Sequence, residues 1–314
     1  MSGLPVTDRT YSGAAIAAPT RTPLTWRIRK YLGFVFISPW LIAFLAFDLI
    51  PTASAFWYSF TDWNVISGSS NWVGTANYRE MIEGDRLFWP SVRNTLYYVG
   101  VSVPLGIVAG FFLALLLNTK IRFQGAYRTL FYLPAVVPTV AATLLWIWVF
   151  DTRNGLLNRA LGVVGVDPIR WLTSPDYSKQ ALIIMSLWSI GGSMVIYLAG
   201  LQSIPEDLYE AADVDGASWL SKTFRITIPL MTPTIFFNLL LGIIGSFQVF
   251  NAAFIMTGGG PVNSTRFYML HLYETAFQDS RMGYACAMAV ALFMVVLAVT
   301  LFVNWSSKRW VFYS

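Results

Sequence analysis

The chain has 314 residues, of which 56% are apolar and only 12% are charged, and its formal net charge is +5. A soluble domain carries about 25% charged residues, so this chain has too few polar side chains to cover the surface of a soluble globule. The composition excludes a soluble enzyme, a disordered chain, a collagen and a coiled coil. The cations are scattered along the chain, so we also expect no nucleic-acid partner.

Six apolar runs follow one another along the chain, and each is as long as a helical membrane span of about 20 residues. The runs cover residues 32–55, 95–117, 128–150, 181–201, 230–254 and 283–304. Backbone polar groups have no water partner in lipid, so we expect each run to be a helix. The sequence therefore predicts an all-α integral membrane protein with six transmembrane helices in a lipid bilayer.

The amino-terminal segment, residues 1–30, contains Pro, Thr, Ser, Gly and Ala without apolar periodicity, and we expect a mobile cytoplasmic tail there. Lys and Arg are enriched in cytoplasmic segments next to membrane spans. Arg27, Arg29 and Lys30 lie just before the first apolar run. This cluster favours a cytoplasmic amino terminus, and six crossings then place the carboxyl terminus in the cytoplasm too. Residues 31–310 are expected to form one transmembrane domain.

The longest predicted cytoplasmic segment is the loop at residues 202–229. Its acidic first half reads as a short helix that ends at Gly216, a residue type typical of helix ends. A second, basic helix is expected to follow and to end at Pro229, where the membrane begins. From the residues alone, the loop is either a surface connector between two spans or an element that another protein approaches closely.

The spacing inside this loop resembles the EAA motif of ABC importer permeases. Glu210-Ala211-Ala212 is followed after three residues by Gly216 and after nine more by Ile226-Thr227-Ile228-Pro229, with Ile228 where the family pattern has leucine. Other segments are similar to carbohydrate-type permeases of the MalF kind rather than the MalG kind. These segments are Asn94-Thr95-Leu96, Tyr132-Leu133-Pro134 with Pro138, Thr257-Gly258-Gly259-Gly260-Pro261, Ser264-Thr265, Tyr273 and Ala276-Phe277. The resemblance implies the MetI-like permease fold over about residues 30–310.

The resemblance also implies how the chain is driven. Residues 202–229, called the coupling loop from here on, would insert a helix into a cytoplasmic ATPase subunit, with Glu210, Ala211, Ala212 and Gly216 at the contact. The implied partners are a second, MalG-like permease subunit, two ATPase subunits and an extracytoplasmic sugar-binding protein, in a bacterial or archaeal cytoplasmic membrane. ATP and Mg would be used by the ATPase subunits, because this chain has no G-x-x-x-x-G-K-[ST] phosphate loop. No cofactor or metal is expected on the chain itself, and the implied function is import of a di- or oligosaccharide.

The two predicted spans on either side of the coupling loop are interrupted by glycine and polar residues, which is typical of transport sites near the membrane midplane. An aromatic face suits the C–H surface of a sugar, and amides and hydroxyls suit its hydroxyl groups. The candidate pathway residues are Ser186, Trp188, Ser189, Gly192, Ser193, Gly245, Ser246, Gln248 and Asn251. Small residues also pack helices together in lipid, so helix packing is the alternative role for them.

Two other functions stay open at the level of the sequence. An importer permease for a non-sugar solute, such as an amino acid, a polyamine or glycerol phosphate, would share the coupling loop. An intramembrane enzyme would need a nucleophile with a base, or a metal cluster. The chain contains one histidine, His271, and one cysteine, Cys286, so we expect no catalytic residues.

Overall fold

The computed structural model describes residues 23–119 and 122–312, and most of them are helical. The chain divides into two compact units, residues 1–54 and 55–314. The first unit contains α1 (Pro23–Phe44), the π-helical turn Leu45–Leu49 and the start of α2 (Ile50–Tyr58). None of residues 32–54 is buried, and apolar side chains are exposed all round the helix. A helix that is apolar all round is typical of a membrane span.

Helix α1 begins before the border that the sequence suggested at residue 31. Its first residue is Pro23, and proline is favoured at the first helical position because the missing N–H has no helical partner there in any case. Residues 23–30 therefore belong to a helix and not to the predicted tail. The rest of that tail, residues 1–22, lies outside the described residues.

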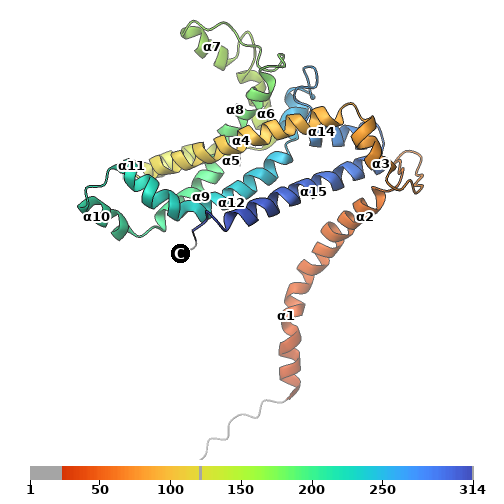
Figure 1. Cartoon of the computed structure of the whole chain (residues 1–314), viewed down its shortest axis with the longest axis horizontal. Coiled ribbons are helices and arrows are strands. Elements are labelled where there is room, and N and C mark those ends of the chain that lie inside the picture. The colour runs from red at the N-terminus through yellow and green to blue at the C-terminus, as the bar shows by residue number, and fades with distance from the viewer. Residues whose placement is uncertain (1–22, 120–121, 313–314) are drawn as a thin grey trace, which may run out of the picture. The chain divides into compact units, whose positions relative to one another are not determined.

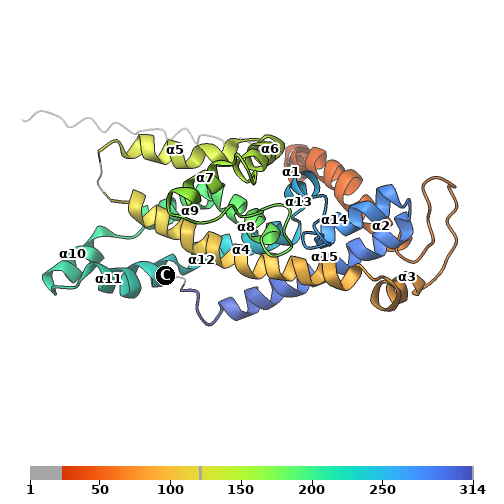
Figure 2. The ribbon, with the colours of Figure 1, turned by 90° about the horizontal axis from the view of Figure 1, so that it is seen from above.

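The second unit is built around the long helix α4 (Phe88–Leu117), which packs against α8 (Ser178–Trp188), α9 (Gly191–Gln202) and α12 (Ile228–Phe247). Helix α15 (Met282–Ser307) packs against α12, so that α4, α12 and α15 run side by side (Figures 1 and 2). The other elements of this unit are α3 (Ala76–Arg79), α5 (Gln124–Val136), α6 (Thr139–Val149), α7 (Leu156–Val163), α10 (Glu206–Val214), α11 (Trp219–Lys222), α13 (Asn251–Met256), α14 (Tyr268–Tyr273) and the π-helical turns Glu80–Gly84, Thr223–Thr227 and Glu274–Gln278.

Apolar clusters mark the two ends of α4. Ala114, Leu117, Leu201, Ile204 and Met231 belong to the cluster at its last turns, next to the coupling loop. Met81, Phe88, Tyr268, Tyr284 and Met288 form the cluster at its first turn. The coupling loop and the loop before α4 therefore lie at opposite ends of this helix.

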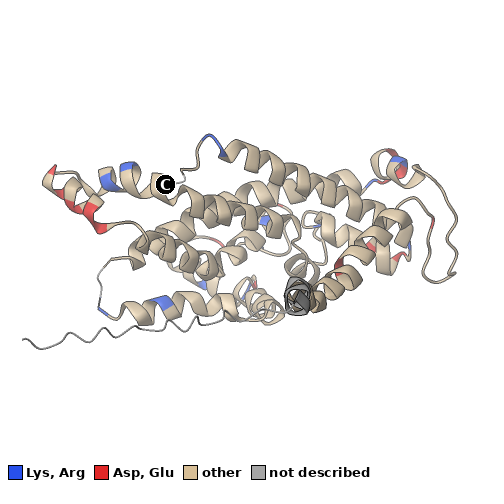
Figure 3. Cartoon of the chain, turned by 90° about the horizontal axis from the view of Figure 1, so that it is seen from below, with Lys and Arg blue, Asp and Glu red and all other residues tan. Residues whose placement is uncertain are grey.

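The predicted crossings correspond to six helical stretches. Four of them are single stretches long and apolar enough to cross a membrane, namely Leu32–Tyr58, Phe88–Leu117, Trp219–Met256 and Met282–Ser307. The other two are bent pairs, α5 with α6 at 99° and α8 with α9 at 46°. Counting each bent pair as one crossing gives six, so the predicted all-α membrane architecture is confirmed. Few residues along the long helices are coloured as charged in Figure 3.

The first bend has a local cause, and a close approach of two helices accompanies the second. Between α5 and α6, Val137 is extended and Pro138 follows it, because proline disfavours the helical conformation of the preceding residue. At the start of α9, a Cβ atom on Gly191 would lie 2.2 Å from the carbonyl oxygen of Phe131 in α5. Glycine at this position therefore allows α9 to touch the α5 backbone.

Buried polar contacts join the start of α4 to α14 and α15. The Asp85 carboxylate lies 2.6 Å from His271 Nε2 and accepts hydrogen bonds of 2.8 Å from the Tyr284 hydroxyl and the Leu87 backbone N–H. Burial raises the pKa of Asp85, but the hydrogen bonds from His271 and Tyr284 outweigh burial, so the net pKa is below its ordinary value. Asp85 is therefore held as a carboxylate at neutral pH.

Candidate functional site

The coupling loop folds into two short helices, α10 and α11, as predicted, and they project from one end of the second unit (Figures 1 and 2). Helix α10 ends in a Schellman motif, in which the Ala217 N–H donates to the Ala212 carbonyl at 2.9 Å and the Gly216 N–H donates to the Asp213 carbonyl at 3.1 Å. Gly216 has a φ angle of +71°, which glycine adopts without steric cost. The predicted helix-ending role of Gly216 is confirmed.

Side chains connect α10 to the helix that follows it. Lys222 Nζ lies 2.6 Å from Asp213 Oδ1, and the hydroxyl oxygens of Tyr209 and Thr227 lie 3.0 Å apart. Tyr209 also packs against the apolar cluster at the last turns of α4. The two helices of the coupling loop are thus held to each other and to the bundle.

The EAA residues lie on the accessible side of this loop. Glu210, Ala211 and Gly216 are exposed and Ala212 is half-buried. Within residues 23–119 and 122–312, the Glu210 side chain has neither an ion-pair nor a hydrogen-bond partner. The same loop carries exposed apolar side chains, namely Leu208, Val214, Trp219, Leu220 and Phe224. The ribbon in Figure 3 has acidic residues on α10 and basic residues toward α11, and exposed apolar residues flanked by charge are typical of a protein contact.

Pro229 does not end a helix, contrary to the expectation from the sequence. Helix α11, the π-helical turn Thr223–Thr227 and α12 follow one another without a break, and Pro229 lies in the first turn of α12. The π turn is closed by a hydrogen bond from the Ile228 N–H to the Thr223 carbonyl. This wider turn precedes the proline directly, so the missing N–H of Pro229 is accommodated without breaking the helix. The coupling loop therefore continues directly into α12.

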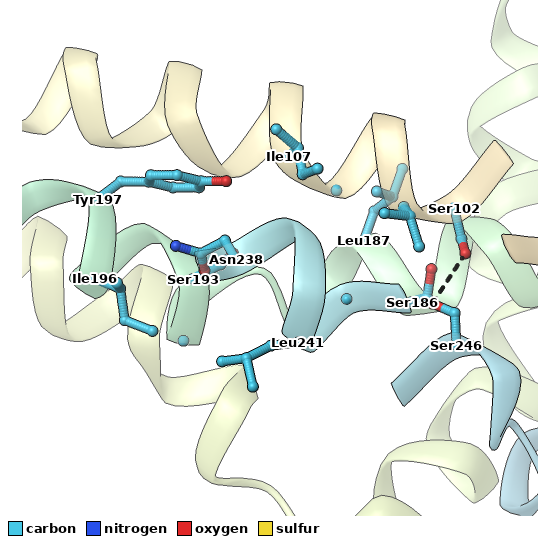
Figure 4. Close-up of a pocket in the computed structure, with 14 residues that line it drawn as sticks. Ser102, Ile107, Ser186, Leu187, Ser193, Ile196, Tyr197, Asn238, Leu241 and Ser246 are labelled. Atoms are coloured by element: carbon cyan, nitrogen blue, oxygen red, sulfur yellow. Dashed lines mark hydrogen bonds between the residues drawn. The ribbon is translucent and has the colours of Figure 1, made fainter. Parts of the chain in front are cut away.

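Two cavities that share Ser186 lie between the helices of the second unit. The near cavity, closer to the coupling loop, has a volume of about 410 Å³ and is lined by α4, α8, α9 and α12 (Figure 4). The far cavity has a volume of about 440 Å³ and is lined by α4, α5, α6, α8 and residues 248–252. Both volumes lie within the range of about 300–1,000 Å³ typical of small-molecule sites.

The predicted pathway residues divide between these cavities. Ser186, Gly192, Ser193 and Ser246 line the near cavity. Ser186, Trp188, Ser189, Gln248 and Asn251 line the far cavity. Gly245 is exposed and lines neither of them. The structure thus brings eight of the nine predicted residues to two adjoining cavities, where their contact with a substrate stays a prediction.

The far cavity is open on one side. Ser189, Gln248 and Asn251 are exposed there, and Trp188 packs edge-on against Trp146 with ring centroids 6.0 Å apart. Polar side chains that face hydrocarbon lack hydrogen-bond partners at a cost in free energy. This side of the chain therefore suits water or another protein rather than lipid.

Sequence reasoning missed five polar residues that line the cavities, namely Tyr98, Ser102, Thr139, Tyr197 and Asn238. Tyr197 and Asn238 each lie alone in an apolar run, where a single polar residue gives no pattern to recognise. Helical spacing is the signal that could have found one of them. Asn238, Gly242 and Ser246 recur every four residues and so share one face of α12.

The membrane-spanning helices, the projecting coupling loop and the polar cavities define a transport permease subunit. The chain belongs to the family of binding-protein-dependent transport system inner membrane components, whose model matches residues 103–311. This membership confirms the resemblance carried by the EAA motif and makes the chain a multi-pass membrane subunit of a transport system.

Particular relatives are similar over most of the chain. The probable ABC transporter permease protein YesP of Bacillus subtilis strain 168 is 40% identical, over 90% of this chain and 92% of its own. The trehalose/maltose transport system permease protein MalF of Thermococcus litoralis is 33% identical, over 86% of this chain and 91% of its own. A chain in the crystal structure of the bacterial alginate ABC transporter in complex with alginate pentasaccharide-bound periplasmic protein has a TM-score of 0.79 and 26% identity, covering 91% of this chain and 97% of its own.

Proposed function

We propose that the chain is the permease subunit of an ATP-driven importer for a di- or oligosaccharide and forms half of the translocation pathway. Relatives named for trehalose/maltose and alginate transport support this substrate class. The observation that carries the proposal is the open far cavity, in which Trp188 lies among exposed polar side chains such as Gln248 and Asn251. An aromatic ring beside amides and hydroxyls suits a sugar, which has both C–H and hydroxyl surfaces.

The proposed assembly has four partner subunits of three kinds. A second, MalG-like permease covers the open side of the far cavity and completes the pathway. An extracytoplasmic sugar-binding protein delivers the sugar, a role supported by the periplasmic protein bound to the alginate transporter. Two cytoplasmic ATPase subunits bind ATP and Mg. The coupling loop and both chain termini then lie in the cytoplasm, and the membrane is the cytoplasmic membrane of a bacterium or archaeon.

The coupling loop is the proposed contact with the ATPase. Glu210 is exposed and has no partner within the described residues, so its carboxylate is available to a basic group of the ATPase. Ala211 and Ala212 permit close approach, and Trp219 and Leu220 offer exposed apolar surface. ATP binding closes the ATPase pair and moves this loop, which shifts the two-state equilibrium of alternating access.

Uptake by the assembled transporter tests the proposed substrate class. The chain, its second permease, the ATPase subunits and the binding protein are reconstituted in proteoliposomes, and uptake of labelled maltotriose, arabinotriose and an alginate trisaccharide is measured. We expect ATP-dependent uptake of at least one of these sugars. If transport responds only to a binding protein loaded with an amino acid, a polyamine or glycerol phosphate, the proposed substrate class is wrong and that solute is the substrate.

Trp188→Ala tests the position of the pathway. Loss of the indole removes the aromatic face of the far cavity, so we expect uptake to fall about tenfold, equivalent to about 1.4 kcal/mol, while the complex still assembles. Trp148→Ala is the matched control, because Trp148 is exposed on α6 and lines neither cavity. Unchanged uptake kinetics in Trp188→Ala would remove this residue from the pathway.

A further inference from the structure

The near cavity is bordered by a tyrosine whose hydroxyl has no hydrogen-bond partner among the described residues. The Tyr197 side chain on α9 is 0% exposed, and its hydroxyl oxygen forms no hydrogen bond with any described residue. Its ring meets Phe111 edge-on with centroids 5.6 Å apart. Buried tyrosine hydroxyls usually find a hydrogen-bond partner, so this one needs an explanation outside the folded chain.

A second polar group faces the same cavity from α12. Asn238 is 7% exposed and donates its Nδ2 to the Thr234 carbonyl at 3.0 Å, while its Oδ1 accepts no hydrogen bond from the described residues. Ser193 donates to the Ile190 carbonyl at 2.8 Å, which leaves its oxygen free to accept. Figure 4 shows Tyr197, Ser193 and Asn238 close together along the cavity wall.

These groups lie closer to the coupling loop than the residues of the far cavity do. Tyr197 follows Trp188 by nine residues along α8 and α9, and Asn238 precedes Gln248 by ten residues along α12. Ten residues of helix are about 15 Å long. Helix α9 runs toward the coupling loop and α12 runs away from it. Tyr197 and Asn238 are therefore both displaced from the far-cavity residues toward the coupling-loop end of the bundle.

We propose that Tyr197 and Asn238 form a second sugar-binding station, which holds the sugar after it leaves Trp188 and before it reaches the cytoplasm. The Tyr197 hydroxyl exchanges a hydrogen bond with one sugar hydroxyl, and Asn238 Oδ1 accepts from another. Ser102 and Ser246, whose hydroxyl oxygens lie 3.5 Å apart, continue the polar wall between the two stations. The proposal rests on the proposed import of a sugar.

The ligand at this station is the neutral, hydroxyl-rich part of an oligosaccharide, because none of the described residues that line the near cavity is charged. The Tyr197 hydroxyl is enclosed in the present conformation. The sugar therefore reaches it only when α9 and α12 move apart during the transport cycle.

Tyr197→Phe distinguishes a sugar-binding role of the Tyr197 hydroxyl from a purely structural role. We expect the maximal uptake rate of the assembled transporter to fall about tenfold, with an unchanged KM for the sugar-loaded binding protein, since the first contact with the sugar is elsewhere. The melting temperature should not fall, because the hydroxyl makes no hydrogen bond within the described part of the chain. Tyr268→Phe is the control, since it deletes a buried hydroxyl that does donate, to the Met288 carbonyl at 2.8 Å. It should lower the melting temperature and leave uptake per folded complex unchanged.

Asn238→Leu should also lower the maximal uptake rate. In the double variant with Tyr197→Phe, the fold-decrease in this rate should be smaller than the product of the two single fold-decreases, because both side chains hold one ligand. The probe is whichever of maltotriose, arabinotriose or the alginate trisaccharide the wild-type transporter takes up. Uptake of none of them would refute the proposed function, and the station with it. Wild-type uptake that Tyr197→Phe leaves unaltered would refute the station alone.

Discussion

Asp85 shows how one carboxylate joins elements that are distant in the chain. It precedes α4, yet it contacts His271 on α14 and Tyr284 on α15. The hydrogen bonds from these two side chains keep the pKa of Asp85 below its ordinary value in spite of burial. The charged form is therefore the form that stabilises this end of the bundle.

Asp85→Asn is expected to destabilise the protein at pH 7 by about 1.5–3 kcal/mol, the range for a hydrogen bond to a charged group. The folded pKa lies below the ordinary value of 3.8, so the stabilisation is complete above about pH 4 and disappears as the pH falls through the folded pKa. Melting temperatures in detergent should therefore differ at pH 7, and the difference should be smaller at pH 3.

Asp176→Asn is the control for this measurement, because Asp176 is exposed. Its melting temperature should match that of the wild type at both pH values. Equal melting temperatures of Asp85→Asn and the wild type at pH 7 would contradict the stabilising role of the carboxylate.

At the scale of elements, the coupling loop is the part of the chain that the sequence predicted in most detail. Glu210 and Gly216 stand out because the motif fixes their spacing, and helix-ending glycine follows a local rule that needs no tertiary contact. The error at Pro229 arose because the π-helical turn before it has no signature in the sequence. The helix end at Gly216 could therefore be predicted from the sequence, whereas the π-helical turn before Pro229 could not.

The cavities were less predictable for a related reason. Runs of apolar residues indicate that helices exist, but which faces meet depends on contacts such as that of Gly191 with Phe131, which joins segments far apart in the sequence. Tyr197 and Asn238 each lie alone among apolar neighbours. Their common cavity becomes visible only once α9 and α12 are placed together.

Glu210→Lys tests the coupling role at this scale. We expect the variant to insert into the membrane with a normal melting temperature, because the Glu210 side chain is exposed and without a partner among the described residues. Sugar uptake should fall at least tenfold, while ATP hydrolysis no longer responds to the loaded binding protein. The physical reason is the reversal of charge at the proposed contact with the ATPase.

Glu83→Lys makes the same change of charge at the other end of α4 and should leave coupling intact, since Glu83 is exposed there. Normal uptake by Glu210→Lys would count against the role of the coupling loop. A loss of uptake in both variants would show a general effect of charge instead.

For the whole molecule, the arrangement across the membrane decides whether the proposed function is possible. Two single-cysteine variants are made in a background that carries Cys286→Ser. One is Asp213→Cys in the coupling loop and the other is Glu83→Cys before α4, and both are treated with a membrane-impermeant maleimide. We expect intact spheroplasts to label Glu83→Cys and to label Asp213→Cys only after permeabilisation, because the two positions lie at opposite ends of α4. Labelling of Asp213→Cys in intact spheroplasts would place the coupling loop out of reach of any cytoplasmic ATPase.

The unbroken helical run from Trp219 to Phe247 has a mechanical consequence. Its 29 residues correspond to about 43 Å of helix, and α11, the π-helical turn and α12 follow one another in it without a break. Over that length, a tilt of about 5° about the Trp219 end moves the other end sideways by about 4 Å. That amplitude is comparable to the 3.5 Å that separates the hydroxyl oxygens of Ser102 and Ser246, so a small rotation at the coupling-loop end is geometrically sufficient to make or break polar contacts within the helix bundle.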